Sequence, residues 1–203
     1  GNNMRFKEWT TTTDKVVFAN KNSAATTFTM PGHHVTITAT YEEIPYCGIT
    51  VTGGSTYSSR YRAGATVTIT ANSPTGKTFR EWSADGSDVV FADKYSKSTT
   101  FTMPERKVTV EALFDNTQYT VTVNGGTANV GTAVYGETVT ITAAEPESGK
   151  KFNYWTTSDI GYSAFADRYA AHTTFTMPAK NVAVTAGYTN TTKGSQTAPG
   201  APT

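Results

Sequence analysis

The hexapeptide TTFTMP stands at residues 26–31, 99–104 and 173–178 of this 203-residue chain, letter for letter. In an extended strand alternate residues point to opposite faces, so its phenylalanine and methionine share one face and its threonines the other. Proline cannot donate to a sheet ladder and ends such a strand. The hexapeptide therefore predicts a short strand that buries one face in a core. The expected core residues are Phe28, Met30, Phe101, Met103, Phe175 and Met177.

A larger repeat of about 73 residues surrounds the hexapeptide. The front half of this repeat occurs only twice: ITVTGGSTYSSRYRAGATVTITANSPTG at 49–76 matches VTVNGGTANVGTAVYGETVTITAAEPESG at 121–149. The sequence thus holds about two and a half repeats. The expected segments are the C-terminal half of a first repeat at 1–41, a second repeat at 42–115, a third repeat at 116–189, and a flexible Thr/Pro/Gly linker at 190–203.

Within each repeat the apolar residues alternate with threonine, as in TVTITA at 66–71 and 138–143. This period of two predicts strands with one buried face. The chain has 41 threonines and a single leucine, Leu113, a composition that favours strands over helices. Gly-Gly at 53–54 and 125–126 predicts tight hairpins. The fold class expected is all-β, built from tandem small antiparallel modules in the form of a sandwich, a barrel or a compact sheet.

Charge and composition exclude several classes of partner. The net charge is +1 and the pI about 8.0, with basic residues scattered among carboxylates, so we expect no nucleic-acid partner. No apolar run approaches the ~18 residues that would span a bilayer. A single cysteine, Cys47, excludes an intrachain disulfide and a thiolate-rich zinc site.

Three tryptophans at a spacing of 73, namely Trp9, Trp82 and Trp155, are the candidate ligand residues. On a flat strand, Phe79 and Trp82 would lie on opposite faces, because three positions separate them. Either a bulge turns both rings inward, or the tryptophan faces outward and can stack on a ligand such as a sugar. The sequence leaves both interpretations open.

Other polar residues give no catalytic constellation. His33-His34 is replaced by Glu105-Arg106 in the second copy, and Cys47 lies in no nucleophile motif. The recurring Asn20, Asp93 and Asp167 fit turn caps, with calcium as the alternative. Lys77 and Lys150 recur as an internal Lys–Asn isopeptide would require, but no partner asparagine recurs with them. We expect no enzyme activity, no cofactor and no metal.

Taken in order, the motifs of the two complete repeats resemble those of the divergent internalin B-repeat family. They are Gly53-Gly54, Gly64 to Ala71, Gly76 to Trp82, Thr100 to Pro104 and Val108 to Phe114, then Gly125-Gly126, Gly136 to Ala143, Gly149 to Trp155, Thr174 to Pro178 and Val182 to Tyr188. The resemblance implies a tandem repeat of a secreted or wall-anchored bacterial surface protein, with modules of sandwich or β-grasp-like form. It brings no catalytic residues with it.

The resemblance predicts an extracellular or cell-surface stalk or spacer that also offers an adhesive surface to a protein or glycan ligand. The alternative is a carbohydrate-binding module that uses exposed tryptophan and tyrosine. A piece shorter than ~40 residues seldom folds alone. We therefore expect the half-repeat at 1–41 to pair its strand edges with the second repeat or with another chain, which would give self-association.

Overall fold

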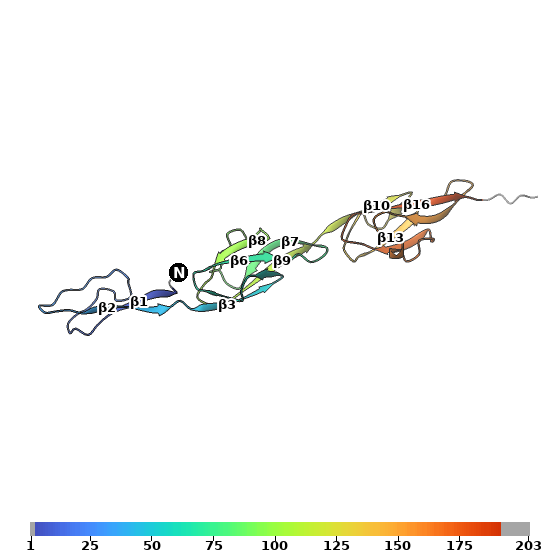
Figure 1. Cartoon of the computed structure of the whole chain (residues 1–203). Coiled ribbons are helices and arrows are strands. Elements are labelled where there is room, and N and C mark those ends of the chain that lie inside the picture. The colour runs from blue at the N-terminus through green and yellow to red at the C-terminus, as the bar shows by residue number, and fades with distance from the viewer. Residues whose placement is uncertain (1–2, 192–203) are drawn as a thin grey trace, which may run out of the picture. The chain divides into compact units, whose positions relative to one another are not determined.

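The computed structural model describes residues 3–191, so most of the expected linker at 190–203 lies outside the described residues. The chain divides into two compact units, residues 1–72 with 81–113 and residues 73–80 with 114–203. Strands dominate both units (Figure 1), and a single short 3-10 turn is present in the described part of the chain. The predicted all-β fold class is confirmed.

The strand bounds follow the three repeats. The first repeat contains β1 (Met4–Thr11) and β2 (Ile37–Glu43). The second contains β3 (Tyr46–Thr52), β4 (Gly54–Thr56), β5 (Arg60–Arg62), β6 (Thr66–Ala71), β7 (Lys77–Ala84), β8 (Ser98–Thr102) and β9 (Val108–Asn116). The third contains β10 (Gln118–Asn124), β11 (Gly126–Ala128), β12 (Thr132–Val134), β13 (Thr138–Ala143), β14 (Lys150–Thr156), η1 (Tyr162–Ala164), β15 (His172–Thr176) and β16 (Val182–Asn190).

Each complete repeat holds one four-stranded and one three-stranded sheet. In the third repeat the strand orders are β12-β10-β16-β14 and β11-β13-β15, and in the second they are β5-β3-β9-β7 and β4-β6-β8. Each complete repeat has one parallel strand pair among its antiparallel pairs. In the third repeat β10 and β16, the first and last strands, run side by side in parallel (Figure 1), and in the second repeat β3 and β9 do the same. Val121 lies opposite Val182 in the third repeat. A parallel pair needs a long crossover, and the rest of the repeat provides it.

The two sheets of the third repeat share one core. Every second residue of the strands contributes to this core, so the apolar face of each strand is its inner face. The buried side chains are Val121, Ala133, Val139, Ile141, Trp155, Phe165, Phe175, Met177, Val182, Val184 and Ala186. Threonines such as Thr138 and Thr176 lie on the outer face and are exposed.

A β-bulge decides where the repeated tryptophan points. The register of β14 against β16 shifts between Phe152 and Tyr154. The extra residue brings Phe152 and Trp155 to the same face, with ring centroids 5.6 Å apart. The first repeat has the same shift between Phe6 and Glu8. The bulge is therefore the correct one of the two interpretations left open by the sequence.

Candidate functional site

The first threonine of the hexapeptide accepts a hydrogen bond from the loop before it. In the third repeat, the backbone N–H of Asp167 donates to Thr173 Oγ1 at 3.1 Å, and Thr173 is only 5% exposed. The same bond recurs in the other repeats, at 3.1 Å from Asp93 to Thr99 and at 3.0 Å from Asn20 to Thr26. In the two complete repeats the contact is partly buried, and an N–H that loses its acceptor there is costly, so the hydroxyl has a structural role.

The loop residue whose N–H donates this bond also uses its own side chain to cap a turn. Asp167 Oδ1 accepts the backbone N–H of Tyr169 at 2.8 Å, and Asp93 Oδ1 accepts that of Tyr95 at 2.9 Å. Asn20 makes the same contact to Asn22 at 3.1 Å. Such side chain to backbone bonds are typical of Asx turns. Calcium needs six to eight oxygen ligands, and no group of three or more His, Cys, Asp or Glu that could hold a metal occurs within residues 3–191.

The phenylalanine and methionine of the hexapeptide lie in the core of both complete repeats. Phe101 and Met103 are 3% and 1% exposed, and Phe175 and Met177 are 2% and 0% exposed. Phe175 also meets Phe165 edge to face, with ring centroids 6.1 Å apart. This geometry is favourable for aromatic pairs beyond the area that they bury.

The tryptophans of the complete repeats are core residues. Trp82 is 2% exposed and Trp155 0% exposed. Trp155 Nε1 donates to the carbonyl of Ala170 at 3.1 Å, and so its one polar atom is satisfied inside the fold. A ligand cannot stack on either ring, because both rings are buried. Trp9 is half-buried and donates to Ser23 O at 3.1 Å.

The two glycines of each Gly-Gly hairpin have different roles. Gly125 has φ of 74°, in the left-handed region that favours glycine. At Gly126 an added Cβ would lie 2.3 Å from Thr142 O and 3.1 Å from Trp155 Cη2. Gly54 is placed likewise, with Trp82 Cη2 2.5 Å from the added Cβ. The second glycine is therefore needed because the buried tryptophan packs against the hairpin backbone.

The remaining reactive groups do not converge. Cys47 is buried at 8% exposure in β3, and His33 and His34 are exposed in a turn. His172 Nδ1 lies 2.9 Å from Thr142 Oγ1 on the outer face. Lys77 Nζ donates to Asn116 Oδ1 at 2.5 Å, whereas Lys150 Nζ donates to Glu147 Oε2 at 2.7 Å. The Lys77 contact is an exposed hydrogen bond between side chains of neighbouring strands.

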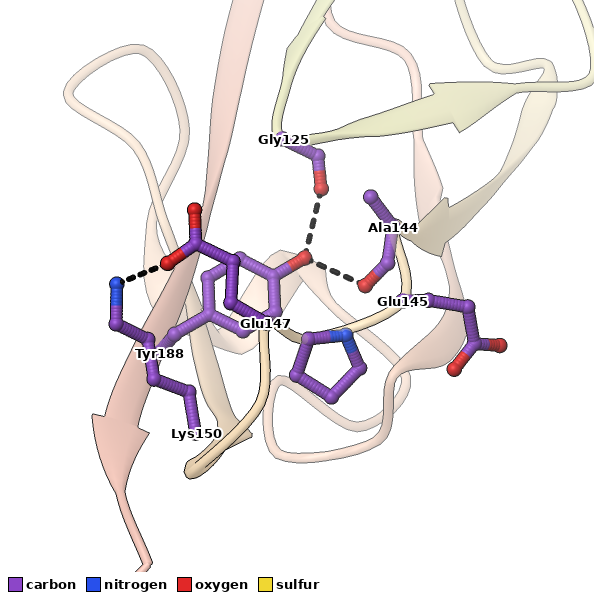
Figure 2. Close-up of a pocket in the computed structure, with 7 residues that line it drawn as sticks. Gly125, Ala144, Glu145, Glu147, Lys150 and Tyr188 are labelled. Carbon is purple, nitrogen blue, oxygen red and sulfur yellow. Dashed lines mark hydrogen bonds and ion pairs between the residues drawn. The ribbon is translucent and has the colours of Figure 1, made fainter.

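One small pocket lies at the edge of the third repeat, with a volume of about 220 Å³. Figure 2 shows the Tyr188 hydroxyl directed at the carbonyls of Gly125 and Ala144, at 3.0 and 2.7 Å. Beside it Lys150 pairs with Glu147 at 2.7 Å, and this ammonium lowers the pKa of the Glu147 carboxyl. Ordinary ligand pockets have at least ~300 Å³. These contacts fasten the hairpin to the last strand and leave little room for a substrate.

Comparison with protein families matches the divergent InlB B-repeat domain to residues 2–45, 48–118 and 119–192. The chain belongs to this family. The family resemblance read from the motifs is thereby confirmed, and the B-repeat is a domain of bacterial surface proteins. Comparisons with curated proteins and with solved structures gave no match.

The core side chains of the first B-repeat are more exposed than their equivalents in the complete repeats. Met30 is 61% exposed, whereas the equivalent methionines Met103 and Met177 are 1% and 0% exposed. The expectation that Met30 lies in a core is wrong. In the complete B-repeats a carbonyl of the front half accepts the backbone N–H of this methionine. Ala65 O accepts that of Met103, and Glu137 O accepts that of Met177, each at 2.8 Å. Phe28 of the same repeat as Met30 is only half-buried.

Within the described residues, β1 and β2 pair only with each other. The expected strand pairing of the first B-repeat with the second is therefore not formed. A bidentate ion pair connects the first and second B-repeats instead: Arg5 Nη1 and Nη2 donate to the Glu105 carboxylate at 2.6 and 2.9 Å. This contact lowers the pKa of the Glu105 carboxyl.

Proposed function

We propose that this chain is a non-catalytic tandem repeat region of a secreted or cell-surface bacterial protein, in which the B-repeats serve as a stalk or spacer and offer an adhesive surface. One observation carries the proposal. The residues that recur between the B-repeats are used to build the repeat itself. The buried Trp155, the capping Thr173 and the close-packed Gly126 are all occupied inside the fold.

The reactive and charged side chains also support a non-catalytic role. A catalytic site needs a nucleophile and a base within hydrogen-bond reach, and an oxyanion or metal site beside them. Cys47 is buried in β3, whereas His33 and His34 lie in an exposed turn. The groups with shifted pKa values are in surface ion pairs such as that of Asp88 with Arg106. Pairs of this kind belong to the surface of the repeat.

The spacer role is tested by adding repeats. Chains carrying residues 119–192 once, twice and three times after residues 48–118 would be measured by small-angle X-ray scattering. A spacer predicts that the maximum dimension grows by a constant increment for each added B-repeat. A dimension that stays constant as repeats are added would show that the repeats fold back on one another, and the spacer role would be lost.

We further propose that the uncovered face of the first B-repeat mediates self-association. Met30 and Ile37, 61% and 39% exposed, occupy positions that are core positions in the complete repeats. β2 also has a free edge among the described residues, where β9 and β16 each have a parallel neighbour. Sedimentation of the whole chain should show association that a chain lacking residues 1–41 does not show. Equal behaviour of the two chains would contradict this proposal.

A further inference from the structure

Two neighbouring surface positions form an ion pair in the first two B-repeats but not in the third. In the first two repeats a lysine of the loop forms an ion pair with a glutamate of the preceding strand. The pairs are Glu8–Lys21 at 2.7 Å and Glu81–Lys94 at 2.8 Å. The same positions hold Tyr154 and Arg168 in the third repeat. The third repeat keeps the cation and replaces the neutralising carboxylate with an aromatic ring.

Arg168 lies among three tyrosine rings. Its Cζ is 4.6 Å from the ring centroid of Tyr154 on β14, 4.1 Å from that of Tyr162 in η1 and 5.2 Å from that of Tyr169. Tyr154 and Tyr169 meet edge to face at 6.2 Å. Aromatic faces stabilise a guanidinium by cation–π attraction, but they cannot accept all of its five N–H bonds.

The guanidinium therefore retains a charge and donors that the described chain does not satisfy. Its Nε is buried and has no hydrogen-bond partner within residues 3–191. None of the carboxylates in that range forms an ion pair with Arg168. The side chain is half-buried, so the rings orient it while part of it faces solvent.

The surrounding rings remain open to a ligand. Tyr162 is 52% exposed and Tyr169 66% exposed. The face of an aromatic ring is partly negative, and attracts the partly positive C–H groups on the flat face of a sugar ring. A guanidinium binds a carboxylate through two parallel hydrogen bonds. Together these groups match a sugar that carries a carboxylate.

We propose that the third B-repeat binds acidic saccharides at Arg168, between Tyr154, Tyr162 and Tyr169. This inference deepens the adhesive role proposed above and rests on it, whereas the spacer role does not depend on it. A saccharide is favoured over an acidic peptide, because acidic motifs are matched by clusters of cations, and this site offers one cation among three rings. The first two B-repeats lack the site, since their lysines are neutralised by Glu8 and Glu81.

The experiment is an NMR titration of the whole ¹⁵N-labelled chain with 3′-sialyllactose and with trigalacturonic acid. Lactose and maltotriose serve as neutral controls. Binding of an acidic sugar should shift the amide signals of Tyr154, Tyr162, Arg168 and Tyr169, and the neutral sugars should not. Arg168→Gln should weaken binding about tenfold or more, because a charged hydrogen bond is lost.

Two further variants separate the site from general charge. Tyr154→Glu with Arg168→Lys recreates the ion pair of the other repeats and should abolish binding. Lys151→Gln removes an exposed cation from the same strand and should leave binding unchanged. In every variant, unchanged signals elsewhere in the third repeat show that it is folded.

Several results would overturn the proposal: no binding of either acidic sugar, equal binding of the neutral sugars, insensitivity to Arg168→Gln, or tighter binding of a hexaglutamate peptide. If the chain adheres to bacterial or host surfaces independently of Arg168, the adhesive role stands and this site fails. The scattering measurement does not involve Arg168 and reports on the spacer role alone.

Discussion

At the scale of single residues, each recurring position of the B-repeat answers a specific steric or hydrogen-bonding need. Gly126 lets the hairpin backbone approach Trp155, and Thr173 supplies a buried acceptor. These needs depend on partners far along the chain, since Trp155 follows Gly126 by 29 positions. Small changes at such positions should therefore destabilise a whole repeat.

We expect Gly126→Ala to destabilise the third repeat by ~1–3 kcal/mol, because the added Cβ meets the carbonyl of Thr142 and the ring of Trp155. Urea unfolding followed by amide exchange and mass spectrometry, resolved to peptides of this repeat, would measure the change. Gly131→Ala is the matched control, since its added Cβ has nothing within 4 Å. Equal stability of the two variants would refute the packing argument.

Thr173→Val should cost ~1–3 kcal/mol, because the Asp167 N–H loses its acceptor in a buried place. Thr173→Ser keeps the hydroxyl and should recover most of this loss. Thr176→Val changes an exposed threonine of the same hexapeptide and should have little effect. The same exchange measurement applies, and a Thr173→Val variant as stable as Thr176→Val would show that the cap contributes nothing.

At the scale of elements, an aspartate from the loop that follows β7 or β14 binds the start of the last strand of each complete repeat. Asp85 Oδ2 accepts the N–H of Thr109 in β9, and Asp159 Oδ2 accepts that of Ala183 in β16, both at 2.8 Å. In the second repeat Arg106 also contacts Asp85 and Asp88, at 2.8 and 2.6 Å. The hydrogen bonds from Arg106 lower the pKa of both carboxyls.

The second repeat should therefore be sensitive to acid. Because both folded pKa values lie below the unfolded value of about 4, these contacts stabilise the fold above that pH. Their contribution is lost as the pH falls through the lowered folded pKa. Arg106→Gln should lower the urea midpoint of the second repeat at neutral pH and flatten its dependence on pH below about 4.

Resolved NMR amide signals of the second repeat would report this midpoint. The third repeat, which carries Lys180 in place of Arg106, serves as the control in the same sample. Its midpoint should be the same in both proteins. Parallel pH profiles of the second repeat with and without Arg106 would rule out the linkage.

At the scale of the whole molecule, the chain combines two closed repeats with one whose core face is open. Closed repeats bury their methionine and tryptophan, and the first repeat exposes Met30 and Ile37. Exposed apolar groups beside a free strand edge favour association. The self-association proposed above should therefore depend on these two side chains.

We expect the double variant Met30→Ser with Ile37→Ser to weaken self-association about tenfold or more, as burial of one or two apolar side chains predicts. Sedimentation velocity over a range of concentrations would measure it. Val17→Ser is the control, since Val17 is 79% exposed on a loop away from the strands. Association that is unchanged in the double variant, or equally weakened by Val17→Ser, would exclude this face as the interface.

The sequence by itself determined the repeats, the strand-rich fold class and the family, because alternation, glycine pairs and recurring motifs are local signals carried by neighbouring residues. It also marked the inner face of TVTITA and TTFTMP, since side-chain direction alternates along any strand. The correspondence between residues of different repeats could also be read from the sequence, because the recurring motifs are local.

Only the tertiary structure decided which strands pair in parallel, where the bulge turns Trp155 inward, and which residue Thr173 caps. It also showed that Met30 is exposed, and that Tyr154 and Arg168 lie together in the third repeat. The physical reason is common to all of these. They depend on contacts between segments far apart in the chain, and the local two-residue period is the same whichever partner a strand has.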